Sequence, residues 1–127
     1  MLWFVGADAQ FVLPQLELRA EYLRGGSPGD AASGTYALDL KNGGYVEALF
    51  RLGPVLGLLG RAELRDAVVT LAMDRVYVTQ SWRAVAGARL TLGPHVTLKV
   101  EAIHNGEYGR VPSIPDDVLT SSLVVQY

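Results

Sequence analysis

The chain has 127 residues, of which 50% are hydrophobic and 19% charged, with 14 glycines, 6 prolines and no cysteine. This composition fits a single folded domain and excludes both a disordered chain and a disulfide-stapled scaffold. The formal net charge is −2 and no basic cluster occurs along the sequence, so nucleic acid is not an expected partner.

The sequence also bears on targeting and on membrane helices. It has no stretch of 18 uninterrupted apolar residues, which excludes a transmembrane helix but not membrane-crossing strands, whose polar residues interrupt the hydropathy signal. The segment 1–6 has no basic leader and no small-residue cleavage site, so it is not a secretory signal. If the strands belong in a membrane, further sequence is expected in front of residue 1; without such sequence the membrane interpretation is wrong.

Three prolines, Pro14, Pro54 and Pro94, mark a repeat of 40 residues. After each of them apolar or glycine residues alternate with polar ones, as in 16–21 and 96–101. Alternation with period two is typical of a strand whose two faces meet different environments. Each repeat holds two such strands, which predicts hairpins, whereas a propeller blade would hold four strands.

We predict an all-β chain, an antiparallel up-and-down meander of seven strands. Their expected ranges are about 2–13, 16–24, 43–52, 56–66, 81–92, 96–105 and 117–127. Short turns at 14–15, 53–54 and 93–94 alternate with long connections at 25–42, 67–80 and 106–116. The segment 66–80 is either a loop or an extension of the flanking strands.

Turn length sets the expected register. If 53–55 forms the turn, Leu52 pairs with Leu56 on one face, and Glu47 lies opposite Arg61. By the same counting, the other expected pairs are Leu92 with Val96, and Arg89 with Lys99. Glu101 is expected diagonal to Arg89, close enough to relieve this like-charge contact.

The two predicted faces differ in charge. One carries apolar residues and glycine with no charge at the strand centres, while Arg24 and His104 lie at strand tips. The charges of the other face are Asp8, Glu17, Arg19, Glu21, Glu47, Arg51, Arg61, Glu63, Arg65, Arg83, Arg89, Lys99 and Glu101.

Aromatic residues of the apolar face gather at the strand ends. Trp3, Tyr22 and Trp82 fall near the long connections, and Phe11, Phe50 and Tyr127 fall near the short turns. Such rings favour the boundary between lipid and water, and strands of about ten residues are long enough to cross a bilayer. We therefore predict a transmembrane sheet with these six residues at the lipid interface. The alternative is a soluble barrel or sandwich with the apolar face inside, where Gly60, Ala62, Ala84, Ala86 and Ala88 would pack poorly.

The final strand, 117–127, ends on an aromatic residue and resembles the C-terminal strand of bacterial outer-membrane barrels, which the barrel-assembly machinery reads as an insertion signal. The Leu-Gly-Pro turns leading into strands such as Val-Thr-Leu-Lys-Val-Glu add to this likeness. The chain is similar to the C-terminal part of a porin of the phosphate-selective type.

The resemblance implies a location in the bacterial outer membrane and a channel for passive diffusion of small polar or ionic solutes, with no cofactor. It implies contact with outer-membrane lipid, and with the barrel-assembly machinery through 117–127. It does not fix the solute. The phosphate preference of that family rests on clustered pore lysines, whereas Lys99 is the only lysine on the predicted inner face, so anion selectivity stays open.

The charged face supplies the candidate pore-lining residues. They are Glu17, Arg19, Glu21, Glu47, Arg51, Arg61, Glu63, Arg83, Arg89, Lys99 and Glu101. The strongest candidates are Arg51, Arg61, Arg83 and Arg89, because they lie on neighbouring predicted strands. Interspersed arginine and glutamate can orient polar solutes in a pore. They can equally be cross-strand ion pairs that only hold the sheet together.

No catalytic or metal site is predicted. His95 and His104 fall at opposite rims, and no nucleophile stands near a base. Glu107, Asp116 and Asp117 are expected to be solvated loop carboxylates. We predict that the chain is not an enzyme.

Seven is an odd number of strands, whereas bacterial single-chain barrels have an even number. The first and last strands would leave open edges, which are costly in lipid. We expect residues 1–127 to be one segment, the C-terminal portion of a larger porin-like barrel, closed by missing N-terminal strands or by other copies. The alternative is a soluble or self-assembling antiparallel β-barrel that binds a ligand or partner.

Overall fold

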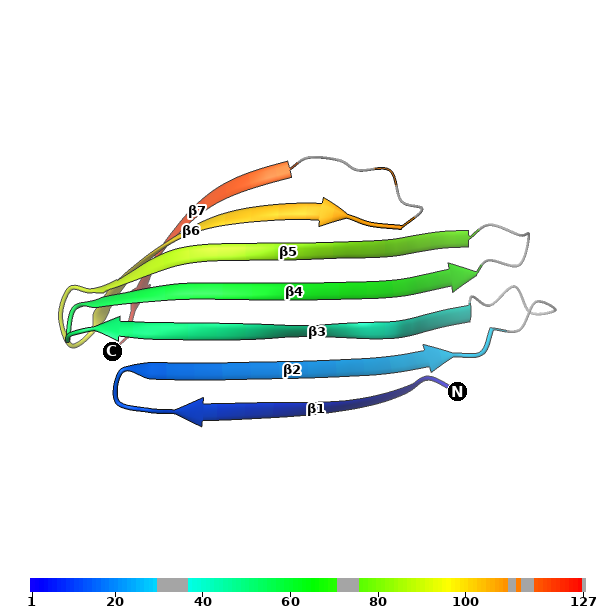
Figure 1. Cartoon of the computed structure of the whole chain (residues 1–127), viewed down its shortest axis with the longest axis horizontal. Helices are drawn as coiled ribbons and strands as arrows, with labels where there is room; N and C mark the ends of the chain where they lie inside the picture. Colours follow the sequence, from blue (N-terminus) through cyan, green and yellow to red (C-terminus); the bar gives the residue numbers. More distant parts are fainter. Residues whose placement is uncertain (30–36, 71–75, 110–111, 113–115, 127) are drawn as a thin grey trace.

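The computed structural model describes residues 1–29, 37–70, 76–109, 112 and 116–126, and within them the chain forms one sheet of seven strands. The strands are β1 (Trp3–Val12), β2 (Leu16–Ser27), β3 (Ala37–Leu52), β4 (Leu56–Thr70), β5 (Val76–Thr91), β6 (Val96–Glu107) and β7 (Asp116–Val125). Each pairs antiparallel with its neighbours in sequence, and Figure 1 shows them side by side in a single layer. The predicted all-β meander is confirmed.

Helices of the length and apolarity needed to cross a membrane are absent from the described part of the chain. The sheet itself is not closed, because β1 and β7 are its two edges. Both edge strands run from the rim with the long connections to the rim with the short turns (Figure 1).

The predicted register is confirmed at the short turns. Leu52 pairs with Leu56, Glu47 with Arg61, and Gly53 adopts a φ of 83° in the turn between β3 and β4. The other expected pairs are also present: Arg89 lies opposite Lys99, and the Leu92 N–H donates to the Val96 carbonyl at 2.9 Å.

Two predicted loops are too long. The prediction of a connection over 25–42 is wrong at both ends, because β2 runs to Ser27 and β3 begins at Ala37. The open question over 66–80 resolves toward strand extension at both ends, since β4 runs to Thr70 and β5 begins at Val76, while 71–75 lie outside the described residues. Branched side chains favour extended backbone, and the partner strand satisfies their backbone groups, so pairing continues past the point where the charge alternation stops.

One bulge lies in β3, near the strand ends by the long connections. It shifts the β2–β3 register between Leu23 and Gly25 and the β3–β4 register between Leu40 and Asn42, because β3 has one residue more than either neighbour there. Because an extra residue reverses which side each following residue faces, the bulge places Leu40 on the charged face, opposite Gly25. Phe4 packs there against Gly25, where a Cβ would overlap the phenyl ring.

The sheet has almost no core. Among the described residues only Ala67 and Val85 are buried apolar side chains, and the chain exposes 9053 Å². A compact globular protein of this 13.7 kDa mass exposes about 6,600 Å². Large apolar side chains of one face lie open to the surroundings, among them Val46 at 59% and Leu64 at 60% exposure. No second layer covers them within the described structure.

Candidate functional site

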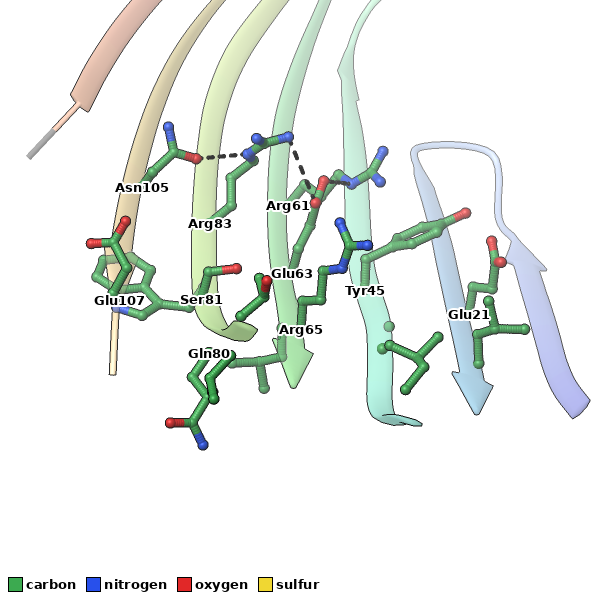
Figure 2. A pocket seen from close by; sticks show the side chains of 18 of the residues that line it. Glu21, Tyr45, Arg61, Glu63, Arg65, Gln80, Ser81, Arg83, Asn105 and Glu107 are labelled. Atoms are coloured by element: carbon green, nitrogen blue, oxygen red, sulfur yellow. Dashed lines mark hydrogen bonds and ion pairs between the residues drawn. The ribbon is translucent and has the colours of Figure 1, made fainter. Parts of the chain in front are cut away.

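A hollow of about 710 Å³ lies on the charged face, in the half of the sheet nearer the long connections. We call this end of the strands upper and the end with the short turns lower. Figure 2 shows side chains that line it, and the polar lining residues come from β2 to β7. They are Glu21, Tyr45, Arg61, Glu63, Arg65, Thr79, Gln80, Ser81, Arg83, Asn105, Glu107 and Asp116.

The register explains why these side chains converge. One row of directly paired residues crosses the whole sheet: Asp8, Glu21, Tyr45, Glu63, Arg83, Asn105 and Asp116. Members of such a row share a face, and neighbours stand about 5 Å apart. A period-two charge pattern in seven successive strands therefore becomes a continuous polar band.

Within this band the arginines and their acceptors form a chain of contacts. The Arg61 Nε lies 2.7 Å from Glu63 Oε1, an ion-pair contact without hydrogen-bond geometry. Arg83 approaches the other Glu63 oxygen at 3.8 Å and donates from Nε to Asn105 Oδ1 at 2.7 Å. Asn105 in turn donates to the Asp116 carbonyl at 3.0 Å. These contacts cross from β4 to β7 and hold Arg83 extended over the hollow (Figure 2).

Arg61 is held on its other side by β3. Its guanidinium lies over the Tyr45 ring at 4.0 Å from the centroid, and its Nη1 is 3.7 Å from Glu47 Oε2. A cation over an aromatic face stabilises by about 0.5–1 kcal/mol when exposed. Tyr45 therefore fixes the position of Arg61 as well as lining the hollow.

A second cluster lies nearer the short turns, around Glu17. This carboxylate is only 8% exposed and accepts hydrogen bonds from Gln10 at 2.9 Å, Arg19 at 2.8 Å and Arg51 at 2.7 Å. The donors come from β1, β2 and β3, so the contacts tie three strands together. A carboxylate satisfied by three donors has a structural role.

Several charges on the same face have no ion-pair partner among the described residues. Arg65 and Glu21 line the hollow, and neither has an ion-pair partner within the described part of the chain. Asp8, also unpaired in this part, stands directly opposite Glu21. Like charges directly opposite each other destabilise a sheet unless a cation intervenes. Arg89 faces Lys99, and Glu101 relieves this like-charge contact by pairing with Lys99 at 2.8 Å rather than with Arg89.

The structure places all eleven predicted pore-lining residues on the charged face, from Glu17 on β2 to Glu101 on β6. It brings Arg61 and Arg83 together at the hollow, whereas Arg51 and Arg89 lie nearer the short turns. The sequence prediction missed some lining residues, namely Tyr45, Ser81, Asn105 and Glu107, and left Arg65 out of the pore-lining set. These residues have odd numbers, like the charged residues of the same face in β3, β4, β5 and β6. This shared parity could have identified them.

An apolar band also lies on the charged face, below the hollow. It consists of two rows that are offset by two residues between β4 and β5, where Leu59 pairs with Gly87 and Val85 with Arg61. The rows are Leu49 and Leu59 on β3 and β4, and Val85, Ile103 and Val118 on β5 to β7. The sequence analysis did not identify this band, because it assigned only the charged residues to this face. The band separates the polar row of the hollow from the lower cations near the short turns.

The predicted interface aromatics Trp3, Phe11, Tyr22, Phe50 and Trp82 lie on the apolar face, and Tyr127 lies outside the described residues. Tyr22 and Trp82 share one cross-strand row, and the Tyr22 hydroxyl donates to Asn42 Oδ1 at 2.9 Å.

Two loop assignments are wrong. Asp116 and Asp117 begin β7, and Glu107 ends β6, so they are strand residues. Asp117 Oδ1 contacts His104 Nδ1 on the apolar face, which also carries Arg24 and Asp66 near the long connections, and His104 stacks edge-on against Trp82 at 5.1 Å. Cross-strand pairing brings this histidine and carboxylate together. Groups of three or more metal-ligating side chains are not found within the described ranges.

Tyr108 secures the connection that follows β6. Its N–H donates to the Gln80 carbonyl at 2.9 Å, and its hydroxyl donates to the Arg65 carbonyl at 3.4 Å. Burial raises the pKa of the Tyr108 hydroxyl, and the nearby Asp66 carboxylate raises it further. The side chain therefore stays a neutral donor beside the strand that carries Arg65.

Comparison with protein-family models, with curated proteins and with solved structures gives no match to this chain.

Proposed function

We propose that the chain is a segment of a porin-like β-barrel in the bacterial outer membrane, whose charged face lines a channel for passive diffusion of small polar or ionic solutes. The observation that carries the proposal is a single-layer sheet with one open apolar face and one charged, hollowed face. Lipid would cover the first face and water would fill the second. No catalytic chemistry is part of the proposal.

The slant of the aromatic residues supports this assignment. Trp82, on β5, lies in the same cross-strand row as Ala7, on β1. This row is four residues nearer the short turns than Trp3. Phe50, on β3, is level with Leu16, two residues below Phe11. With about 3.4 Å per residue and 4.8 Å per strand, each line makes an angle of about 35° with the cross-strand rows.

Strands of membrane barrels tilt by about 35–45°, so a flat membrane boundary crosses their rows at the same angle. Aromatic residues at both rims follow such a boundary, while Tyr22, on β2, lies below the upper line. A soluble sandwich gives no reason for large rings to follow two parallel slanted lines.

The side that carries the hollow favours the channel over the alternative. In a soluble barrel with apolar residues inside, the hollow would be expected on the apolar face. It lies instead on the charged face, between Glu21 and Glu107. The soluble or self-assembling barrel that binds a ligand or partner remains the second candidate, favoured by the open edges at β1 and β7.

The open edges define the proposed partners. β1 has Asp8 as its only charged residue, and neither edge strand contains a proline or a lysine that would discourage pairing. We expect further strands of the same barrel, or other copies, to pair with both edges. Insertion would use the barrel-assembly machinery through 117–127, with outer-membrane lipid around the apolar face.

The test is to express the protein with its natural flanking sequence in a Gram-negative host and to reconstitute it in planar bilayers. Stepwise conductance from the purified outer-membrane fraction is the expected result. Because the chain has no cysteine, the substitutions Leu58→Cys and Leu59→Cys form a matched pair on opposite faces. A charged thiol reagent should react at position 59 and spare position 58, which a lipid-borne quencher should reach.

Recovery of the protein in the soluble fraction, with no conductance and with no quenching at position 58 by lipid, would rule out the channel. Equal labelling at both positions in membranes would contradict the assignment of the two faces.

A further inference from the structure

We propose that the hollow binds zwitterionic solutes with adjacent charges, such as α-amino acids, with the solute carboxylate on Arg65 and its ammonium group between Asp8 and Glu21. This inference rests on the proposed channel function and names its solute class. Three observations carry it: the charges that lack partners, their spacing, and the open floor between them.

The internal ion pairs of the described residues leave unpaired charge on Glu21 and Arg65, which line the hollow, and on Asp8, which stands beside Glu21 just outside it. Arg61 and Arg83 share Glu63, so this set is largely compensated. Arg65, in contrast, has no carboxylate partner within the described residues, and Asp8 and Glu21 face each other without a cation. In Figure 2 Tyr45 lies between Glu21 on one side and the arginines of β4 on the other.

This distribution discriminates between charge classes. A simple anion would satisfy Arg65 but leave the two opposed carboxylates unrelieved, and a simple cation would leave Arg65 unpaired. A zwitterion supplies both missing partners at once, and a fixed pair of opposite charges recognises such a dipole by orientation.

The spacing suits a short dipole. Glu21 and Arg65 lie two strands and two residues apart, so their Cα atoms are about 12 Å from each other. An α-amino acid has its nitrogen and carboxylate oxygen about 3 Å apart. With charge-assisted hydrogen bonds of about 2.8 Å at each end, it bridges groups about 9 Å apart. The remaining difference is within the reach of a glutamate and an arginine side chain, and the proposal requires both to turn toward the solute.

On β3, which lies between the two charges, Tyr45 carries its ring on one side of the line that joins them, and Gly43 on the other side leaves the floor without a side chain. Gly43 pairs with Leu23 on one side and with Arg65 on the other, and it lines the hollow. A Cβ at this position would meet its nearest neighbours at 3.5 Å, so a larger residue fits the sheet but fills the floor. The glycine therefore leaves room for the body of the solute.

The experiment measures equilibrium binding of alanine, N-acetylalanine and alaninamide to the protein with its natural flanking sequence in lipid nanodiscs at pH 7. These probes present a zwitterion, an anion and a cation of similar size. Alanine should bind at least tenfold more tightly than either singly charged probe. The Glu21→Gln substitution should shift the preference toward N-acetylalanine, and Arg65→Gln should shift it toward alaninamide.

Two further variants separate binding from folding. Gly43→Val should abolish alanine binding while ion conductance in potassium chloride persists at a reduced level. Lys41→Gln, which removes a cation outside the hollow, should leave all three affinities unchanged.

The inference is overturned if the three probes bind equally or not at all to protein that conducts ions, a result that leaves the proposed channel intact. Protein that neither conducts nor enters membranes refutes the proposed function, and binding of alanine to it would then place the site in a soluble barrel.

Discussion

Replacing Glu17 with glutamine should destabilise the sheet by about 2 kcal/mol, although the side chain keeps its size. The carboxylate is 8% exposed and accepts from Gln10, Arg19 and Arg51. The amide loses the charge and turns an N–H₂ group toward donors. Hydrogen bonds to charged groups contribute about 1.5–3 kcal/mol each. Arg19 and Arg51 have side chains 52% and 40% exposed, so water recovers part of their loss, which lowers the total.

The assay is urea unfolding of the protein in lipid vesicles, followed by tryptophan fluorescence. With a slope of about 2 kcal/mol per molar urea, the midpoint should fall by about 1 M. The matched control is Glu101→Gln, which removes one contact, to the half-exposed Lys99, and should cost under about 1 kcal/mol. Equal midpoints for the two variants would refute the view that the Glu17 cluster ties β1, β2 and β3 together.

Three further outcomes follow from the same geometry. Leu58→Arg, on the apolar face, should cost about 2–4 kcal/mol of unfolding free energy in vesicles, whereas Leu59→Arg, one residue away on the charged face, should cost much less; equal costs would contradict the face assignment. Glu21→Gln should raise the free energy of unfolding slightly, by a few tenths of a kcal/mol, because it removes a like-charge contact with Asp8; a clear loss of stability would show that Glu21 has a stabilising partner. Gly53→Ala should cost about 1–2 kcal/mol in the same assay from its φ of 83° alone, since its Cβ would meet no atom within 4 Å, and an unchanged midpoint would rule out this strain.

The strands and their faces were predictable because two simple rules reinforce each other. Period-two alternation assigns each residue to a face, and a tight turn at Gly53 fixes which residues pair. Together they give the opposition of Glu47 and Arg61, and with it the polar row at the hollow. A row of this kind is a consequence of backbone register, which the sequence pattern specifies.

What escaped prediction depends on features that alternation does not encode. The bulge between Leu40 and Asn42 adds one residue to one strand and turns Leu40 to the charged face, with no signature in composition. Glu101 pairs with Lys99 and not with Arg89. Both cations are close enough to reach the Glu101 carboxylate, so side-chain conformation decides between them. Pairing partners on a shared face are therefore less predictable than the face itself.

The nearest-neighbour topology of the sheet has a consequence for how it forms. Every strand pairs only with strands adjacent in sequence, so no contact within the described chain waits for the closure of a long loop. The sheet can grow by one strand at a time from any hairpin. It has two unpaired edges after the first hairpin and still two after β7, so the edge penalty stays constant while paired length increases. Growth is thus favourable at each addition, and no single strand has to arrive last.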